Sequence, residues 1–501
     1  MNRARSLALP LWTAVACHRF PRGIHLAAIL LASLFPHPAQ AQGLRIDPTN
    51  PRYLNWRGRP ILVVGSGEHY GAVLNPAFSF ERYLATLHRD GLNHTRLFTG
   101  AAYVEPAGAF NIEKNTLAPR GDLYLAPWAR SADPGYAGGG SRFDLDRWDE
   151  TYFARLKSFV RTAANHRVFV EVNLFCPFYE ESQWQLSPFH PDNNINGAGL
   201  HVARTNVYTL DHHGGLLTYQ ERFVHRVVAE LEPFDNLYYE ICNEPYFGGV
   251  TLEWQARIAR IIAEAQWNHR RPKLISQNIA NKTATVTHPI PQVSLHNFHY
   301  ATPPDAVANN SHLNLPIGDN ETGFRGTHNA PYRVEAWDFL MAGGALFSHL
   351  DYSFAAGHET GTYQYPASQP GGGNPTLRRQ FRFLRSFLEA LPFTRMKVEA
   401  SAKVTRSSVP LSIRALTQPD RFVAAYIHTT EDKPDDDRKK LEAGAEIQLN
   451  VAPGEWRASW IDPVTGREIS RQTTRTTGTE LTLHPPPFAT DLALKLARTR
   501  T

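Results

Sequence analysis

Residues 237–245 read Leu-Tyr-Tyr-Glu-Ile-Cys-Asn-Glu-Pro, a short apolar run that leads directly into an Asn-Glu pair followed by proline. Pro245 has no N–H group and restricts the preceding residue to extended backbone, so we expect Glu244 where a strand ends and a loop begins. In parallel α/β architectures, the carboxyl ends of the strands carry the ligand-binding and catalytic groups. The stretch therefore predicts a functional carboxylate at such a strand end.

Strand and helix patterns alternate along the chain on both sides of this stretch. Short apolar runs predict strands at 61–64, 94–98, 168–175, 237–242, 273–277, 293–299, 315–319 and 345–350. Between them apolar residues recur at helical spacing, as in Tyr152, Leu156, Phe159 and Ala163. Eight strands that alternate with helices favour a closed parallel barrel over an open sheet. We predict an α/β fold, a (β/α)8 TIM barrel over residues 42–394.

The sequence changes in character beyond Leu391. Short β-rich runs at 421–428, 446–451, 456–461 and 480–483 are separated by Gly, Pro, Asp and Thr. They predict a small all-β sandwich domain over residues 395–501, with Asp462–Gly466 as a hairpin connection. We interpret this domain as a packing appendage of the barrel. An independent sugar-binding module is the alternative, although paired aromatic residues do not stand out in it.

The first 41 residues have the pattern of a secretory signal peptide. Arg3, Arg5, Arg19 and Arg22 precede the apolar run Leu26–Phe35, and Ala39-Gln40-Ala41 supplies small residues at the two cleavage positions. The run is shorter than the roughly 20 apolar residues of a membrane-spanning helix. We predict a secreted or periplasmic protein with no membrane association after cleavage, and an uncleaved anchor is the alternative.

Charge and cysteine usage exclude several classes of function. Removing residues 1–41 takes away four arginines and no acidic residue, so the formal charge falls from +5 to +1. Basic residues do not cluster with aromatic ones, which argues against a nucleic-acid partner. Only Cys176 and Cys242 remain, which excludes a disulfide framework and a cysteine-based zinc site, and two buried thiols are favoured over a bonded pair. The histidines show no metal-ligand spacing such as His-Glu-x-x-His, so we predict no metal and no cofactor.

Polar residues that carry chemistry stand at the ends of four predicted strands. They are Arg96, Asn243, Glu244, His299, Tyr300 and Glu321. In this order and at these positions they resemble the strand-end residues of the retaining glycoside hydrolases of clan A, and of family 5 in particular. The resemblance extends from residue 55 to 355 through these motifs, without continuous similarity. Asn-Glu-Pro alone is weak, and the combination of residues carries the signal.

The resemblance implies an enzyme that cleaves O-glycosidic bonds with two carboxylates. Glu244 would give the proton to the leaving oxygen, and Glu321 would attack the sugar carbon. For that task, the pKa of Glu244 would have to be raised by the nearby negative charge and by partial burial.

The other strand-end residues have supporting roles under the same resemblance. Arg96 and Tyr300 would keep Glu321 ionised and aligned, and Asn243 would bind the 2-hydroxyl of the sugar. His299 would either orient Glu244 or serve as a structural histidine.

Three strand ends differ from the family 5 pattern. The third strand ends at Leu174–Pro177 without the usual histidine. After the last barrel strand, where that family commonly has a tryptophan, the chain has Asp351 and Tyr352, either of which is a candidate for binding sugar hydroxyls. The first strand contributes Glu68 and His69, which either recognise the non-reducing end of the substrate or have structural roles. These departures favour an unusual sugar over cellulose.

Two long loops, Thr99–Arg147 and Pro177–Gly215, follow predicted strands and should cover the catalytic face. They are rich in aromatic and amide side chains, which suit the faces and hydroxyls of sugars, and Trp184 is a candidate binding residue. About a third of the loop aromatics should contact ligand, and the rest should pack the loops together.

We therefore predict a secreted retaining glycosidase that acts on a poly- or oligosaccharide, with carbohydrate as its partner. A transglycosylase that uses the same site is one alternative. A non-catalytic carbohydrate-binding protein that kept the barrel is the other.

Overall fold

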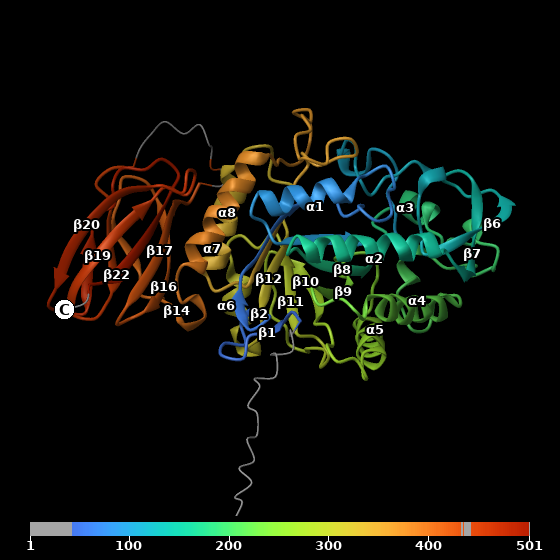
Figure 1. Cartoon of the computed structure of the whole chain (residues 1–501), viewed down its shortest axis with the longest axis horizontal. Coiled ribbons are helices and arrows are strands. Elements are labelled where there is room, and N and C mark those ends of the chain that lie inside the picture. The colour runs from blue at the N-terminus through green and yellow to red at the C-terminus, as the bar shows by residue number, and fades with distance from the viewer. Residues whose placement is uncertain (1–42, 432–433, 435–441, 500–501) are drawn as a thin grey trace, which may run out of the picture. The chain divides into compact units, whose positions relative to one another are not determined.

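The computed structural model describes residues 43–431, 434 and 442–499. The predicted signal peptide at residues 1–41 lies outside the described residues. Residues from Ala41 onward form one compact unit, with a barrel followed by antiparallel sheets (Figure 1). Among the described residues, no helix combines the length and apolar character needed to cross a membrane.

Eight parallel strands close into a barrel, as the sequence predicts. In chain order they are β4 (Val63–Gly67), β5 (His94–Phe98), β8 (Phe169–Phe175), β9 (Leu237–Cys242), β10 (Ile275–Asn281), β11 (Leu295–His299), β12 (Ile317–Glu321) and β13 (Leu346–Leu350). The barrel closes where β13 pairs with β4, with Leu346 opposite Val63. Nearly every strand residue is buried, because the barrel interior fills one face and helices cover the other.

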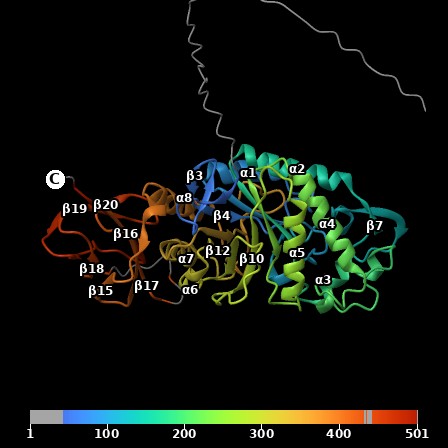
Figure 2. The same cartoon turned by 90° about the horizontal axis from the view of Figure 1, so that it is seen from below.

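Helices surround the barrel where the apolar periodicity is strongest. They are α1 (Phe80–Arg89), α2 (Glu150–Asn165), α4 (Leu216–Leu231), α5 (Leu252–Ala265), α7 (Ala330–Met341) and α8 (Pro375–Glu389). Helix α2 buries Tyr152, Leu156, Phe159 and Ala163, the stripe read from the sequence. Its N-terminus is capped by Asp149, which accepts a hydrogen bond from the Thr151 N–H. Figure 2 shows α4 packed beside α5.

The ring of helices is incomplete between β10 and β12. The described residues between β10 and β11 contain no helix, and a short helix, α6 (Asp305–Asn309), precedes β12. The predicted first strand at 61–64 also needs correction. Ile61 ends β3 (Arg59–Ile61) of a small antiparallel sheet that includes β1 (Arg45–Ile46) and β2 (Leu54–Trp56), and the barrel strand begins only at Val63. Continuous apolarity does not reveal this change of sheet.

The two long loops contain regular structure of their own. The first includes a hairpin of β6 (Trp128–Pro134) and β7 (Ser141–Trp148), in which Trp128 stacks on Trp148 with ring centroids 4.8 Å apart. The second contains α3 (Glu181–Leu186). These loops are therefore packed structures, and most of their aromatic rings stabilise the loops.

The C-terminal residues form two antiparallel sheets, as predicted. One contains β14 (Lys397–Val398), β16 (Leu411–Gln418), β17 (Phe422–Thr429), β22 (Asp491–Arg498), β19 (Gly454–Ile461) and β20 (Glu468–Thr476). The other contains β15 (Lys403–Arg406), β18 (Glu446–Asn450) and β21 (Glu480–Leu483). The predicted hairpin turn at Asp462–Gly466 joins β19 to β20.

Buried contacts join the sandwich to helix α7 of the barrel. Arg333 donates two hydrogen bonds to Asp491, at 2.9 and 3.0 Å, and both side chains are almost fully buried. Trp337 stacks on Tyr426 with ring centroids 5.1 Å apart. Helix α7 is buried on all sides for this reason, so it lacks the one-sided apolar stripe of the other helices. These contacts fit the interpretation of the sandwich as a packing appendage.

Candidate active site

A cavity of about 510 Å³ opens at the carboxyl ends of the barrel strands and contains both predicted glutamates. Glu321 is the last residue of β12, and Glu244 lies two residues beyond the end of β9. The other lining residues are His69, Tyr70, Phe98, Tyr103, Glu105, Phe110, Leu117, Tyr179, Asn243, Phe247, Asn281, Lys282, Tyr300, Thr302, Phe324 and Arg325. Parallel strands place their ends at one face, so residues far apart in sequence meet here.

Four groups hold the Glu321 carboxylate. Arg96 Nη1 donates to Oε2 at 2.8 Å, and the Tyr70 hydroxyl donates to the same oxygen at 2.8 Å. The Tyr300 hydroxyl donates to Oε1 at 2.9 Å, and His299 Nδ1 lies 3.5 Å from that oxygen. Donors on both oxygens fix the orientation of the carboxylate.

The Glu244 carboxylate has a different set of partners. The Tyr179 hydroxyl donates to Oε2 at 2.6 Å, and His299 Nδ1 lies 3.1 Å from Oε1. The Tyr246 hydroxyl is 3.2 Å from Oε1 and 2.5 Å from Asn281 Oδ1, so its single hydrogen serves one of the two. Tyr179 in turn accepts from Asn243 Nδ2 at 2.8 Å. Glu244 therefore has no arginine partner in the site, in contrast to Glu321.

His299 lies between the two glutamates and couples their protonation. Burial lowers the pKa of His299, but the neighbouring Glu321 and Glu244 carboxylates outweigh it and raise the pKa above its usual value. Burial raises the pKa of Glu244, but hydrogen bonding and charge from His299 outweigh it and lower that pKa. This differs from the expected raised pKa of Glu244. The expectation counted burial and nearby negative charge, but not the hydrogen bond and positive charge that His299 brings to this carboxylate.

One ligand-type atom from each of Glu244, His299 and Glu321 lies within 4.8 Å of the other two. Such a group also suits a metal ion geometrically. The Arg96 guanidinium at 2.8 Å from Glu321 disfavours a second cation at this position, so we interpret the group as a site of proton transfer.

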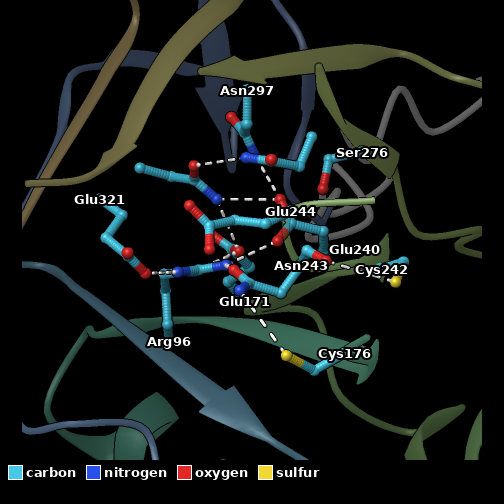
Figure 3. A network of polar contacts seen from close by, with 12 residues as sticks. Arg96, Glu171, Cys176, Glu240, Cys242, Asn243, Glu244, Ser276, Asn297 and Glu321 are labelled. Carbon is cyan, nitrogen blue, oxygen red and sulfur yellow. Dashed lines mark hydrogen bonds and ion pairs between the residues drawn. The ribbon is translucent and has the colours of Figure 1, made fainter. Parts of the chain in front are cut away.

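Beneath Glu321, the Arg96 guanidinium is shared by three carboxylates (Figure 3). Nε donates to Glu171 at 2.6 Å and Nη2 donates to Glu240 at 2.6 Å, while Nη1 serves Glu321. Nη2 also donates to Asn243 Oδ1 at 2.9 Å. All three guanidinium nitrogens are thus engaged, which fixes the guanidinium against the cavity floor.

The pKa values of the two acids below Arg96 are shifted in opposite directions. Burial and the negative charge of Glu171 raise the pKa of Glu240 to about 8. Burial also acts to raise the pKa of Glu171, but Arg96 outweighs it and holds that pKa below its usual range. The Asn297 and Asn320 amides donate to Glu240 Oε2, each at 2.8 Å. Hydrogen bonding on every side keeps these buried acids satisfied.

Three residues that carry or contact the site carboxylates adopt left-handed backbone, which is unusual for residues other than glycine. Tyr70, Glu244 and Tyr300 have φ values of 61°, 37° and 52°. Such conformations cost on the order of 1–3 kcal/mol each and persist where the surrounding structure enforces them. The expectation of extended backbone at Glu244, before Pro245, is therefore wrong. Each of these residues directs its side chain to a site carboxylate or carries one.

Three of the predicted binding residues lie elsewhere. Glu68 is buried and accepts hydrogen bonds from the Gly71 and Ala72 N–H groups and from Thr116, so it ties loops together. Trp184 packs on Phe178 within its own loop, with ring centroids 5.0 Å apart.

Asp351 does not line the cavity either. It is fully buried and pairs with Arg378 of α8 at 2.6 Å. A position at a strand end does not specify which way the side chain points, because successive residues alternate between the barrel interior and the helices.

The remaining predicted residues surround the cavity. His69 and Asn243 line it, and Arg96 and His299 are buried against its glutamates. Cys176 and Cys242 are buried free thiols. Of the aromatic residues in the two long loops, Tyr103 and Tyr179 line the cavity, while Trp128 and Phe189 are buried in loop packing.

Sequence reasoning missed several cavity residues. Tyr70 directly follows His69 after the first barrel strand, and this strand-end position could have identified Tyr70 as a cavity residue. Phe110, Phe247 and Phe324 line the cavity and are about 40% exposed, and no sequence pattern marks them. Glu105 is also missed, because it lies within a long loop whose path depends on tertiary packing.

The buried Glu105 carboxyl predicts a pH-dependent stability. Burial raises its pKa to about 7 from 4.5, and the Glu321 charge adds to this, against hydrogen bonds from Tyr103 and Asn115. The unfolded chain releases this proton at lower pH, so the folded state loses stability as pH rises from about 4.5 to 7. The magnitude is on the order of 3 kcal/mol.

Replacing Glu105 by glutamine removes this penalty. We expect Glu105→Gln to raise Tm by about 3 °C more at pH 8 than at pH 5, measured by calorimetry. Glu113→Gln, at an exposed carboxyl on the same loop, is the matched control. A Tm difference that does not depend on pH would contradict the burial of an ionisable Glu105.

The fold and the cavity together define a (β/α)8 barrel protein with paired carboxylates at its catalytic face. No protein-family model and no curated protein matches the chain. Solved structures do match it. A Bacteroides vulgatus protein proposed to be a glycoside hydrolase has 13% identity and a TM-score of 0.62, covering 92% of this chain and 83% of that one.

Two further structures are similar over comparable lengths. One named as a glycoside hydrolase has 12% identity and a TM-score of 0.59, covering 91% of this chain and 97% of that one. A glycoside hydrolase family 5 structure from Bacteroides vulgatus has 12% identity and a TM-score of 0.58, covering 91% and 93%. At these identities the likeness shows a shared fold, a TIM barrel followed by a β-sandwich.

Proposed function

We propose that this protein is a retaining glycosidase that hydrolyses O-glycosidic bonds of a poly- or oligosaccharide. The observation that carries the proposal is the facing pair Glu244 and Glu321, whose nearest oxygens lie within 4.8 Å in the cavity at the carboxyl ends of the strands. Retaining enzymes hold their carboxyl groups about 5–5.5 Å apart, whereas inverting enzymes need roughly 6.5–9.5 Å to admit water. The short separation supports direct attack by a carboxylate.

In the first step, Glu321 attacks the anomeric carbon and the bond from that carbon to the leaving oxygen breaks. The leaving oxygen takes a proton from Glu244, and a covalent glycosyl ester forms on Glu321. In the second step, the Glu244 carboxylate takes a proton from water, and the water oxygen attacks the anomeric carbon. The ester bond breaks, Glu321 is released as a carboxylate, and the sugar keeps its configuration.

The different partners of the two glutamates support this assignment. Glu321 accepts from a permanently charged arginine and two tyrosines, which stabilises a carboxylate. Glu244 is held by Tyr179 and by His299, whose pKa the neighbouring Glu321 and Glu244 carboxylates raise above its usual value. Once a substrate displaces or neutralises part of this contact, the proton that His299 and Glu244 share is available to the leaving oxygen.

Asn243 is assigned to the sugar 2-hydroxyl on the family resemblance. One of its amide hydrogens bonds to Tyr179, while the other faces Cys176 Sγ at 3.8 Å. That second bond is long and weak, so a sugar hydroxyl can replace it. Export to the periplasm or outside the cell is part of the proposal and rests on residues 1–41. A mature N-terminus at Gln42 would support it.

The test is turnover of a panel of 4-nitrophenyl glycosides and oligosaccharides by the wild-type protein and by Glu244→Gln. We expect wild-type turnover and a loss of at least about 100-fold on natural glycosides in the variant, because glutamine cannot supply a proton. Glu113→Gln is the control. Binding without turnover across the panel would instead indicate a carbohydrate-binding protein, and capture of the glycosyl group by an added sugar in preference to water would indicate a transglycosylase.

A further inference from the structure

A third carboxyl group lies in the catalytic cavity, apart from the two glutamates that carry the chemistry. Glu105 comes from the loop that follows β5 and is 4% exposed. The Tyr103 hydroxyl donates to its Oε1 at 3.0 Å, and Asn115 Nδ2 donates to its Oε2. Among the residues that the structure describes, no Lys, Arg or His lies within ion-pair distance of this carboxyl.

A buried carboxyl without a cation is unusual, because buried charges are normally paired. Each Glu105 oxygen accepts one hydrogen bond in this structure, and a carboxylate oxygen has lone pairs for two. Two acceptor positions are therefore left over. Since Glu105 lines the cavity, a ligand can reach them.

The surroundings hold the carboxyl in place. The Glu105 N–H donates to the Leu117 carbonyl at 2.9 Å, and Asn115 Oδ1 accepts from the Leu117 N–H at 2.9 Å. The Tyr103 ring packs against Phe98 and Tyr179, with centroids 6.0 and 6.2 Å away. A group fixed in this way loses little entropy when it binds a ligand.

Contacts also connect Glu105 to the nucleophile. Tyr70, which donates to Glu321, stacks on Phe98 at 5.0 Å, and Phe98 meets Tyr103, the partner of Glu105. Glu105 and Glu321 both line the cavity of about 510 Å³, and the negative charge of Glu321 raises the pKa of Glu105. A sugar attached to Glu321 in this cavity can therefore reach Glu105.

Beside Glu105, the cavity wall carries His69. Burial lowers the pKa of His69 to about 4, so its imidazole is neutral, and its buried Nδ1 has no hydrogen-bond partner among the described residues. Together these two side chains offer acceptors and one imidazole nitrogen without adding a positive charge. Such a surface suits hydroxyl groups.

We infer that Glu105 binds two neighbouring hydroxyl groups of the sugar that becomes attached to Glu321, one hydroxyl on each carboxylate oxygen. The inference rests on the proposed glycosidase function and adds its substrate class, a neutral pyranoside with two adjacent free hydroxyls. Both hydroxyls act as donors, so the bidentate contact selects against sugars in which either one is missing or substituted.

The test combines Glu105→Gln with substrates that lack single hydroxyls. The substrates are 4-nitrophenyl β-D-glucopyranoside and β-D-mannopyranoside and their 3-, 4- and 6-deoxy analogues. On the parent substrate that turns over, measured at pH 8 where the Glu105 carboxyl is ionised, Glu105→Gln should lower kcat/KM about 10- to 100-fold, as expected for a lost hydrogen bond to a charged group. On the deoxy analogue that lacks a bound hydroxyl, the loss should fall to about threefold or less, because the contact is already absent. Glu113→Gln should match the wild type on all substrates.

An equal loss by Glu105→Gln on every analogue would overturn the inference and leave the glycosidase function standing. No turnover of any glycoside by the wild-type protein would overturn the function instead. In that case the role of Glu105 is tested by sugar binding, which is measured by saturation-transfer NMR with D-glucose, D-mannose and D-glucosamine. Neutral-sugar signals that disappear in Glu105→Gln support the inference. Unchanged signals, or a preference for the cationic D-glucosamine, contradict it.

Discussion

Replacing Glu321 by alanine will lower kcat/KM by about 10⁴-fold or more, and azide will restore turnover to give a glycosyl azide of inverted configuration. In the proposed mechanism, the variant lacks the group that forms the covalent bond. Azide is small enough to occupy the space left by the carboxylate. It then attacks the anomeric carbon from the same side as Glu321 does in the proposed mechanism. A single displacement inverts the configuration.

The matching variant Glu244→Ala should behave differently. Its turnover should fall far less on 2,4-dinitrophenyl glycosides, because a good leaving group departs with little protonation. The glycosyl ester then accumulates on Glu321, since the base for the second step is missing. Azide attacks this ester and gives a glycosyl azide of retained configuration, the product of two displacements.

Nuclear magnetic resonance of the products decides between the alternatives. The first anomer formed by the wild-type protein should have the configuration of the substrate, and an inverted first product would reject the covalent mechanism. Azide products with exchanged configurations would exchange the roles of Glu244 and Glu321. Glu113→Gln serves as the control, since it changes a carboxyl outside the cavity.

Replacing Arg96 by alanine will reduce kcat/KM by several powers of ten, which corresponds to roughly 3–5 kcal/mol of lost transition-state stabilisation. The reason is the 2.8 Å contact from Arg96 Nη1 to Glu321 Oε2, which orients the proposed nucleophile. From the sequence alone, the fold would be expected to tolerate this change. The structure predicts a loss of stability as well, because Glu171 and Glu240 also depend on the same guanidinium. Leaving buried carboxylates unpaired typically costs 3–5 kcal/mol.

Arg96→Lys separates the two effects. Lysine keeps the positive charge, which offsets the buried carboxylates, but it lacks the planar fork that serves three carboxylates at once. We expect a smaller loss of Tm than in Arg96→Ala and a loss of kcat/KM that remains at least about 100-fold. Thermal unfolding followed by circular dichroism, together with steady-state kinetics, measures both. Near-normal turnover in a folded Arg96→Lys protein would show that Arg96 does not act on the nucleophile.

Much of the barrel is predictable because its signals are local. An apolar run followed by Asn243, Glu244 and Pro245 identifies a strand end, and the helical stripe at Tyr152 to Ala163 matches the buried face of α2. The order of elements then determines that parallel strand ends share one face. This is why Arg96, Glu244, His299, Tyr300 and Glu321, all chosen from strand ends, lie around one cavity.

The direction of a side chain at a strand end is not a local property. Asp351 and Glu68 stand at strand ends just as the two glutamates do, yet one pairs with Arg378 of α8 and the other ties loop N–H groups together. One residue of difference in register turns a side chain from the cavity to the helices. Sequence patterns locate such ends only to within a few residues, so they do not separate these cases.

By itself, the sequence determined the barrel, the β-sandwich and the strand-end residues, because hydrophobic periodicity and proline positions are local properties of the sequence. Only the tertiary structure decided the protonation and the shape of the site. His299 placed against Glu244 lowers the pKa of a carboxyl that was expected to have a raised one. Glu105 enters the cavity because Tyr103 and Asn115 of the same loop hold it there. Both outcomes depend on distances between residues remote in sequence or within an irregular loop, and electrostatic interactions follow those distances.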